Sequence, residues 1–243
     1  MNIQWYPGHM TKTRRQIEAD LKNVDIVVEI IDARIPMSSR NPDIDAICAG
    51  KPRLIVLNRA DQADPARNKQ WAAFFRGQGH AVLETDAKTG SGVNQFSAII
   101  QSVLKDQIAK WREKGQVGRP VRAMVVGVPN VGKSTFINKV ARKKSAKAGD
   151  RPGVTRGKQW VNVDQSLDLL DTPGILWPKF DDQTIGMNLA FTGAVKDDIM
   201  DVETLGCHMM TLLAERYPKT LTDSYKLPEV PAREEGPDTQ HSA

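Results

Sequence analysis

Short apolar runs alternate along the chain with longer amphipathic stretches. The runs have the length and the β-branched content of strands, and they predict strands at 25–31, 53–57, 81–84, 122–126, 159–163 and 167–170. The amphipathic stretches repeat apolar residues every three or four positions, and they predict helices at 11–22, 65–77, 93–113, 133–142 and 202–216. Strands that alternate with helices of this length predict an α/β fold with a mostly parallel sheet.

The organisation of the chain changes at two places. The stretch KGQVGRP at 114–120 has the composition of a linker between two halves of the strand–helix pattern. The final stretch, KLPEVPAREEGPDTQHSA, is rich in proline and acidic residues, which predicts a disordered tail at 226–243.

Composition excludes several classes of protein. With 243 residues, of which 40% are apolar and 26% charged, the chain has the composition of a soluble globular protein of one or two domains. No run is apolar enough for a membrane span, and the opening residues do not resemble a secretory signal. The two cysteines, Cys48 and Cys207, form no metal-binding or disulfide pattern, so we expect a cytoplasmic protein that binds no membrane.

Positive charge gathers in one stretch. The net charge is +5, and residues 139–158 hold eight Lys or Arg against one Asp. Such a cluster attracts phosphate polyanions through release of counterions, although a solvated loop can have the same composition. Its position directly after the strongest motif of the chain favours the first interpretation.

That motif is a phosphate-binding loop. Residues 127–134 read GVPNVGKS, between an apolar strand and a predicted helix. Backbone N–H groups of such a loop point at phosphate oxygens, and the helix N-terminus adds favourable partial charge. Lys133 would bridge the β- and γ-phosphates, and the Ser134 hydroxyl would bind Mg²⁺. The predicted phosphate-binding residues are Asn130, Val131, Gly132, Lys133, Ser134 and Thr135.

Two further segments complete the predicted phosphate and metal site. Asp171 ends a hydrophobic strand in LDLLDTPG, where its carboxylate suits Mg²⁺ and Gly174 offers a backbone N–H to a γ-phosphate. Between the two motifs, Thr155 in PGVT fits a switch segment whose hydroxyl closes on Mg²⁺. Thr155 could also be an ordinary surface residue.

The first half of the chain contains the candidate base-binding residues. The segment NRAD places Asn58, Arg59 and Asp61 after a strand. The carboxylate of Asp61 can accept both N–H groups on one edge of guanine, which adenine lacks, although such an Asp could instead cap the next helix. After another strand, Ala87 and Lys88 could present a backbone N–H to the guanine oxo group. A metabolic P-loop kinase would not need this base-selecting aspartate.

Together these motifs resemble a known family. GVPNVGKS, DTPG, NRAD and the DAK segment resemble the motifs of Ras-type GTPases, with the base-binding pair placed before the phosphate-binding set. That order resembles the circularly permuted P-loop GTPases. The segments WYPGHM, DARIPMSSRNP and GVPNVGKST are similar to those of the ribosome biogenesis GTPase A family.

The resemblance implies a GTP-hydrolysing factor that binds immature large ribosomal subunits and promotes a late step of their maturation. Its implied partners are GTP or GDP and the large subunit with its rRNA, and we expect a monomer. It implies a GTPase domain at 1–178 and a helical segment at 179–225, where the family carries an RNA-binding domain that is incomplete in this chain.

The resemblance also implies catalytic groups. Ile175 stands where Ras-type enzymes carry a water-orienting Gln, and the family points to His9 as its replacement beside Lys133, although His9 could be an ordinary exposed or packing residue. In related GTPases, the residue equivalent to Asn130 is associated with K⁺ in addition to Mg²⁺. An asparagine there could equally bond within its own loop.

The chain departs from the family pattern at two places. Arg59 replaces the Lys of the usual NKxD motif, which bears on nucleotide affinity, and the C-terminal domain is shortened. The alternative function is a nucleotide-regulated RNA-binding module with little turnover, which the isoleucine at position 175 and the shortened C-terminus favour.

Overall fold

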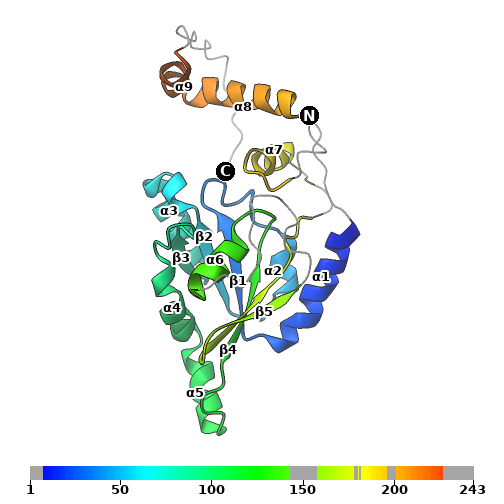
Figure 1. Ribbon diagram of the computed structural model, residues 1–243, viewed down its shortest axis with the longest axis vertical. Coiled ribbons are helices and arrows are strands. Elements are labelled where there is room, and N and C mark those ends of the chain that lie inside the picture. Colours follow the sequence, from blue (N-terminus) through cyan, green and yellow to red (C-terminus); the bar gives the residue numbers. More distant parts are fainter. Residues whose placement is uncertain (1–7, 143–157, 178–179, 181, 196–200, 227–243) are drawn as a thin grey trace. The chain divides into compact units, whose positions relative to one another are not determined.

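The computed structural model describes residues 8–142, 158–177, 180, 182–195 and 201–226 (Figure 1). Contacts group the chain into two compact units, residues 2–196 and residues 197–243, which we describe separately. The predicted division into 1–178 and 179–225 stays a prediction. The predicted tail, apart from Lys226, lies outside the described residues.

The first unit is built on a six-stranded sheet. Its strands are β1 (Ile26–Asp32), β2 (Arg53–Asn58), β3 (Ala81–Thr85), β4 (Val121–Val126), β5 (Gln159–Asp164) and β6 (Leu167–Asp171). Their order is β3-β2-β1-β4-β6-β5, and every neighbouring pair is parallel except β5 with β6. The mostly parallel α/β fold is therefore confirmed, and each predicted strand begins and ends within one residue of the observed one.

Helices precede, connect and follow the strands. They are α1 (Gly8–Asp20), α2 (Asp43–Ile47), α3 (Pro65–Gly77), α4 (Phe96–Val103), α5 (Lys105–Glu113), α6 (Lys133–Val140) and α7 (Gln183–Phe191). Short 3₁₀ turns lie at Leu21–Asn23, Ala60–Gln62 and Val93–Gln95. The sequence determines where α3 begins. Pro65 is its first residue, and the side chain of Asp64 caps the helix by accepting hydrogen bonds from the N–H groups of Ala66 and Arg67.

The prediction of one continuous helix at 93–113 is wrong. A 3₁₀ turn opens it, and it divides into α4 and α5 at Leu104, whose φ of −98° and ψ of 11° depart from helical values. Leu104 is buried, whereas α5 has no buried residue, so the apolar face that anchors α4 ends there. The short helices α2 and α7 were not predicted, because neither shows the long apolar periodicity of the others.

The core lies on both faces of the sheet. All seven residues of β1 are buried, as the central position of this strand requires. On one face, Phe75 and Ala72 of α3 pack in a cluster with Ile55 and Leu57 of β2. Helices α4 and α6 lie side by side, joined by an edge-to-face contact of Phe96 with Phe136 whose ring centroids are 5.0 Å apart.

This topology places five loops at one edge of the sheet. The loops after β1, β2, β3, β4 and β6 all follow the carboxyl ends of parallel strands, which is where open α/β sheets bind ligands. Helix α7 lies over the same edge (Figure 1). The loop between α5 and β4, at 114–120, connects the two halves of the sheet as predicted.

The second unit contains α8 (Val202–Arg216) and α9 (Pro218–Tyr225). Helix α8 matches its predicted range, and the side chain of Asp201 caps it by accepting from the N–H groups of Glu203 and Thr204. Helix α9, which was not predicted, begins with Pro218 at its first position. In the described part of the chain, no helix has the length and apolar character that a membrane crossing requires.

Candidate functional site

The loop GVPNVGKS connects β4 to α6 at the carboxyl edge of the sheet, as expected. At two positions of this loop the structure requires glycine. A Cβ on Gly127, whose φ is +152°, would lie 2.3 Å from the carbonyl oxygen of Ile30, and a Cβ on Gly132, at φ +97°, would lie 2.4 Å from Asn58 Nδ2. The loop therefore lies directly against β1 and the end of β2.

Lys133 is folded into this loop. Its side chain is buried, and Nζ donates to the carbonyl oxygens of Val128 at 2.8 Å and Gly127 at 3.2 Å. Burial lowers the pKa of Lys133 to about 8, while the charge of Asp171 opposes this shift. A bound phosphate would supply the negative charge that such a lysine lacks.

Ser134 and Asp171 are brought together as predicted for a metal site. The Ser134 hydroxyl donates to Asp171 Oδ2 at 2.9 Å. Asp171 is 1% exposed, and its Oδ1 has no hydrogen-bond partner among the described residues. Burial raises the pKa of Asp171, against the opposing effects of Lys133 and the Ser134 hydroxyl. An orphaned buried carboxylate oxygen beside a hydroxyl is a donor set that fits Mg²⁺.

Asn58 joins the two predicted motif sets. Its Nδ2 donates to the carbonyl oxygen of Val131 at 2.8 Å, so the base-binding segment contacts the phosphate loop directly. Its Oδ1 accepts from the Ala87 N–H at 3.0 Å and from the Thr85 hydroxyl at 3.2 Å. One buried side chain thus ties together the loops after β2, β3 and β4.

Arg59 and Asp61 lie beside this junction. Arg59 has a left-handed backbone, with φ of 60°, and its Nη2 donates to the carbonyl oxygen of Asn130 at 2.8 Å. Asp61 is exposed in the turn Ala60–Gln62. The helix cap that Asp61 could have provided is made by Asp64 instead, so the Asp61 carboxylate is not used to begin α3.

The loop after β3 is shaped by Asp86, which sequence reasoning missed. Its Oδ1 accepts from the N–H of Lys88 at 2.8 Å, and its Oδ2 accepts from the N–H and hydroxyl of Thr89. These hydrogen bonds lower the pKa of Asp86, with the Thr89 hydroxyl contributing most. An Asp two residues before a turn N–H was the available sequence signal.

The segment DTPG lies against the phosphate loop. A Cβ on Gly174 would lie 2.6 Å from Pro129 Cα, so a side chain there would collide with backbone. Ile175 is fully buried, its N–H donates to the Gly127 carbonyl at 3.3 Å, and its own carbonyl accepts from Asn41 Nδ2 at 3.4 Å. The position after DTPG therefore offers no side-chain group that could orient water.

Two predicted site residues cannot be placed. Thr155 lies outside the described residues, and so does the side chain of His9, whose backbone belongs to α1. Thr135 follows Ser134 in α6 and is half-buried. The remaining predicted residues come together at the loops after β2, β3, β4 and β6. Their roles stay predictions.

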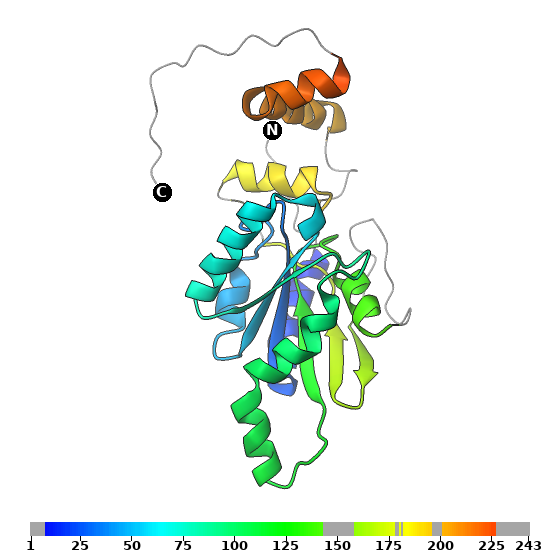
Figure 2. The same ribbon diagram turned by 90° about the vertical axis from the view of Figure 1, so that its left-hand side faces the viewer.

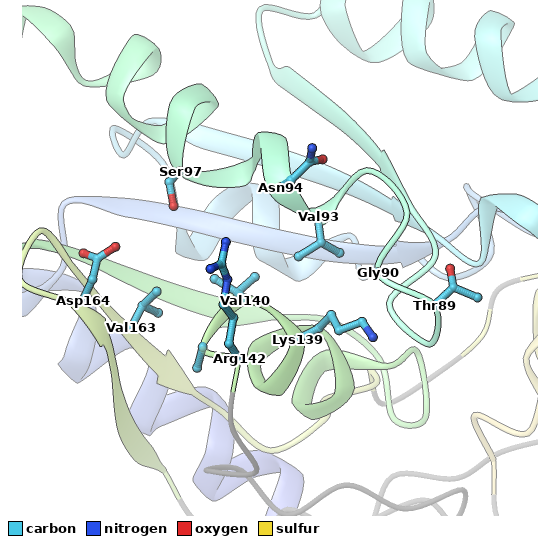
Figure 3. A pocket seen from close by; sticks show the side chains of 11 residues that line it. Thr89, Gly90, Val93, Asn94, Ser97, Lys139, Val140, Arg142, Val163 and Asp164 are labelled. Atoms are coloured by element: carbon cyan, nitrogen blue, oxygen red, sulfur yellow. The ribbon is translucent and has the colours of Figure 1, made fainter.

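A separate cavity lies behind the loop after β3. It has a volume of about 570 Å³ and lies between the end of α6, the start of α4 and the turn between β5 and β6 (Figure 3). Lys139 and Arg142 of the predicted basic stretch line it. None of the predicted nucleotide-binding residues does. In Figure 3 the Lys139 side chain runs toward Gly90, and a Cβ on Gly90 would lie 2.5 Å from Lys139 Cε.

Known proteins share both the sequence and the arrangement. A family described as 50S ribosome-binding GTPase matches residues 122–221. Ribosome biogenesis GTPase A of Bacillus cereus is 49% identical over 231 residues, which cover 95% of this chain and 78% of that protein. Mitochondrial ribosome-associated GTPase 1 of Xenopus tropicalis is 33% identical, covering 92% of this chain and 74% of that protein.

A solved structure agrees with the fold. The crystal structure of GNP-bound YlqF from T. maritima superposes with a TM-score of 0.60 at 29% identity, covering 84% of this chain and 75% of that one. The base-binding segment precedes the phosphate loop in the present chain, which is the circularly permuted order. With near-half identity to the Bacillus protein over nearly the whole chain, this protein belongs to the ribosome biogenesis GTPase A family.

Proposed function

We propose that this chain binds GTP with Mg²⁺ at the carboxyl edge of the sheet and hydrolyses it to GDP and phosphate. The observation that carries the proposal is the junction at Asn58, which joins a guanine-type motif to a phosphate loop through Val131. A phosphate loop by itself serves many nucleotides, whereas this pairing requires guanine through Asp61.

Each group has a distinct task in the proposed reaction. Lys133, Ser134, Thr135, Gly174 and the N–H groups of 130–132 hold the phosphates. The guanine is held by Asn58, Arg59, Asp61, Ala87 and Lys88. The N–H groups of Ala87 and Lys88 donate to Asn58 and Asp86 in this structure, so one of them would exchange that bond for the guanine oxo group. When bound, Mg²⁺ neutralises charge on the phosphates, and Ser134, Asp171 and Thr155 would hold it. The buried lysine, drawn from its carbonyl partners to a phosphate, would hold its proton more firmly in that anionic site.

We further propose that GTP drives a late step in the maturation of immature large ribosomal subunits, which the chain binds in the cytoplasm as a monomer. Its family relatives carry ribosome-related names. The basic stretch 139–158, of which Lys139 and Arg142 line a cavity, is the rRNA contact that its charge favours. His9 orients the attacking water in this proposal, because Ile175 cannot.

One observation favours a second candidate. Since Ile175 is buried and bonded through its backbone, the chain lacks a water-orienting side chain at the usual position. A chain without another such group would bind GTP and rRNA with little turnover, as a nucleotide-regulated RNA-binding module.

One experiment separates the two candidates. GTP hydrolysis is measured in K⁺ buffer with and without large ribosomal subunits, with ATP and Na⁺ buffer as controls. We expect stimulation by subunits that is confined to GTP and lost in His9→Ala. His80→Ala is the matched control, since His80 precedes β3 at the opposite end of the strand from the site. Tight GTP binding without stimulation would favour the second candidate.

A further inference from the structure

A hydrogen bond links the turn that follows helix α7 to the phosphate loop. The carboxamide Nδ2 of Asn130 donates to the carbonyl oxygen of Gly193, just beyond the end of α7, at 3.3 Å. A second contact, from Asn188 Nδ2 to the Ser38 hydroxyl at 3.0 Å, holds the helix to the loop after β1. Figure 2 shows α7 lying across the carboxyl edge of the sheet, above these loops.

The contact fixes the orientation of the Asn130 amide. A carbonyl oxygen only accepts hydrogen bonds, so the amide must turn its NH₂ group toward Gly193 and its Oδ1 away. The backbone of Asn130 is already held, with φ of 57° and its carbonyl bonded to Arg59 Nη2. No hydrogen bond to Oδ1 is present within the described residues. The asparagine therefore presents an uncommitted neutral oxygen from the phosphate loop, and its NH₂ is not used within its own loop.

Glycine is the residue that best fits position 193, where the backbone turns after α7 and its carbonyl accepts from Asn130. Its φ of +73° belongs to the left-handed region that ends many helices, and its N–H donates to the Ala190 carbonyl at 3.0 Å. A Cβ on Gly193 would lie 3.0 Å from Asn130 Nδ2. Any side chain there would strain the turn and press on the amide that the turn orients.

We propose that Gly193 is a positioning residue for a monovalent-cation site at Asn130. By accepting from Nδ2, its carbonyl selects the amide orientation in which Oδ1 is free to bind K⁺, a cation that takes neutral oxygen ligands. The inference rests on the proposed GTPase function, because the bound cation would add positive charge at the phosphate loop where negative charge develops during hydrolysis. The turn after α7 thereby controls whether the phosphate loop can use a cation.

The test compares K⁺ dependence in two readouts. The first is the melting temperature of the chain with Mg²⁺ and a non-hydrolysable GTP analogue, titrated with K⁺ at a constant sum of Na⁺ and K⁺. The second is GTP hydrolysis under the same titration. We expect Gly193→Ala to raise the half-saturating K⁺ concentration about tenfold in both, equivalent to about 1.4 kcal/mol.

Three further variants isolate the effect. Gly115→Ala is the matched control, because Gly115 has a similar φ of +75° with no atom near its Cβ position, and it should leave the K⁺ titration unchanged. Asn130→Gly keeps the left-handed backbone and removes the amide, and it should abolish the K⁺ dependence. In the Asn130→Gly background, Gly193→Ala should have no further effect on the K⁺ titration.

Each contrary result has its own meaning. An unchanged half-saturating K⁺ concentration in Gly193→Ala overturns the positioning role, and so does a K⁺ effect of that change in the absence of the amide. GTP binding and hydrolysis that do not depend on K⁺ in the wild type overturn the cation site while leaving the proposed function intact. A chain that does not bind the GTP analogue overturns both proposals.

Discussion

Asn58 Nδ2 donates to the backbone carbonyl of Val131 across 2.8 Å, although the two residues are 73 positions apart. Asn58 ends β2 and Val131 belongs to the loop after β4, so the sheet order places them together. The contact shows why the order of the motifs along the chain is immaterial to the site. Parallel strands deliver their following loops to the same edge in either order.

Removal of this junction should cost stability as well as binding. Asn58→Ala would leave the carbonyl of Val131 and the N–H of Ala87 without their buried partners. We expect the free energy of unfolding to fall by about 2–4 kcal/mol, measured by urea denaturation. The control is Asn162→Ala, whose exposed amide bonds only at the surface and which should change stability by less than about 0.5 kcal/mol. Equal effects of the two substitutions would contradict this assignment.

Asp61 should determine which base is bound. In Asp61→Asn the amide NH₂ would face the 2-amino group of guanine, donor against donor, whereas xanthine carries an oxo group at that position. We expect GTP affinity to fall by about two orders of magnitude or more, while affinity for xanthosine triphosphate rises. Fluorescent-nucleotide titration measures both. Asp64→Asn, in the helix cap, should keep the preference for GTP, and a GTP preference retained by Asp61→Asn would exclude Asp61 from base recognition.

The buried lysine predicts a pH dependence of stability. Burial lowers the pKa of Lys133 to about 8 from an ordinary 10.5, so between these values the unfolded chain holds the proton more tightly than the folded one. The free energy of unfolding contributed by Lys133 therefore increases as pH rises through this window, by about 2–3 kcal/mol. Below pH 8 the folded protein carries the buried charge at full cost.

Comparison with Lys133→Met isolates this contribution. The difference in unfolding free energy, wild type minus variant, should increase between pH 8 and pH 10 in urea denaturation series. Saturating GTP analogue should abolish that slope for the wild type, because phosphate charge restores the lysine proton. A difference that stays constant with pH in the nucleotide-free protein would contradict the lowered pKa.

Much of the fold followed from local patterns. Most of the strands were predictable because they are short apolar runs, and β1, buried along its whole length, is the clearest. The edge strand β5 is mostly exposed and mixes apolar with polar residues. The division of the helix at Leu104 could not be predicted from the sequence. The apolar spacing continues across Leu104, and the N–H of Ile108 still bonds to the Leu104 carbonyl. Only the end of burial beyond Leu104, a tertiary property, separates α4 from α5.

In the candidate site, too, some residues could be predicted from the sequence and others could not. Motif residues such as Lys133 and Asp171 could be predicted, because phosphate and magnesium chemistry demands those side chains after strands. The groups that hold the motif segments in place could not be predicted. Gly193 reaches Asn130 across 63 positions and Asn41 reaches Ile175 across 134, and no spacing rule connects residues so distant in sequence.

Gly174 should be required for hydrolysis. The Cβ introduced by Gly174→Ala would lie 2.6 Å from Pro129 Cα, so DTPG and the phosphate loop must move apart. A displacement of this kind misaligns reacting groups, and we expect the rate of GTP hydrolysis to fall about 10- to 100-fold. Gly206→Ala is the control: its Cβ meets nothing within 4 Å, and alanine in α8 should raise stability by about 0.5–1 kcal/mol without changing the rate. Full activity in Gly174→Ala would contradict the required close approach.

The cavity lined by Lys139 and Arg142 should contribute to binding of rRNA. If both cations contact phosphates, the double variant Lys139→Gln with Arg142→Gln loses two phosphate contacts, so fewer counterions are released when rRNA binds. The slope of log affinity for large subunits against log salt should then become shallower by about 0.7–0.9 for each cation. The pair Lys105→Gln with Lys110→Gln, on exposed positions of α5, changes the net charge equally and should leave the slope unchanged. Because both pairs alter long-range attraction alike, identical slopes would mean that the cavity makes no direct phosphate contact.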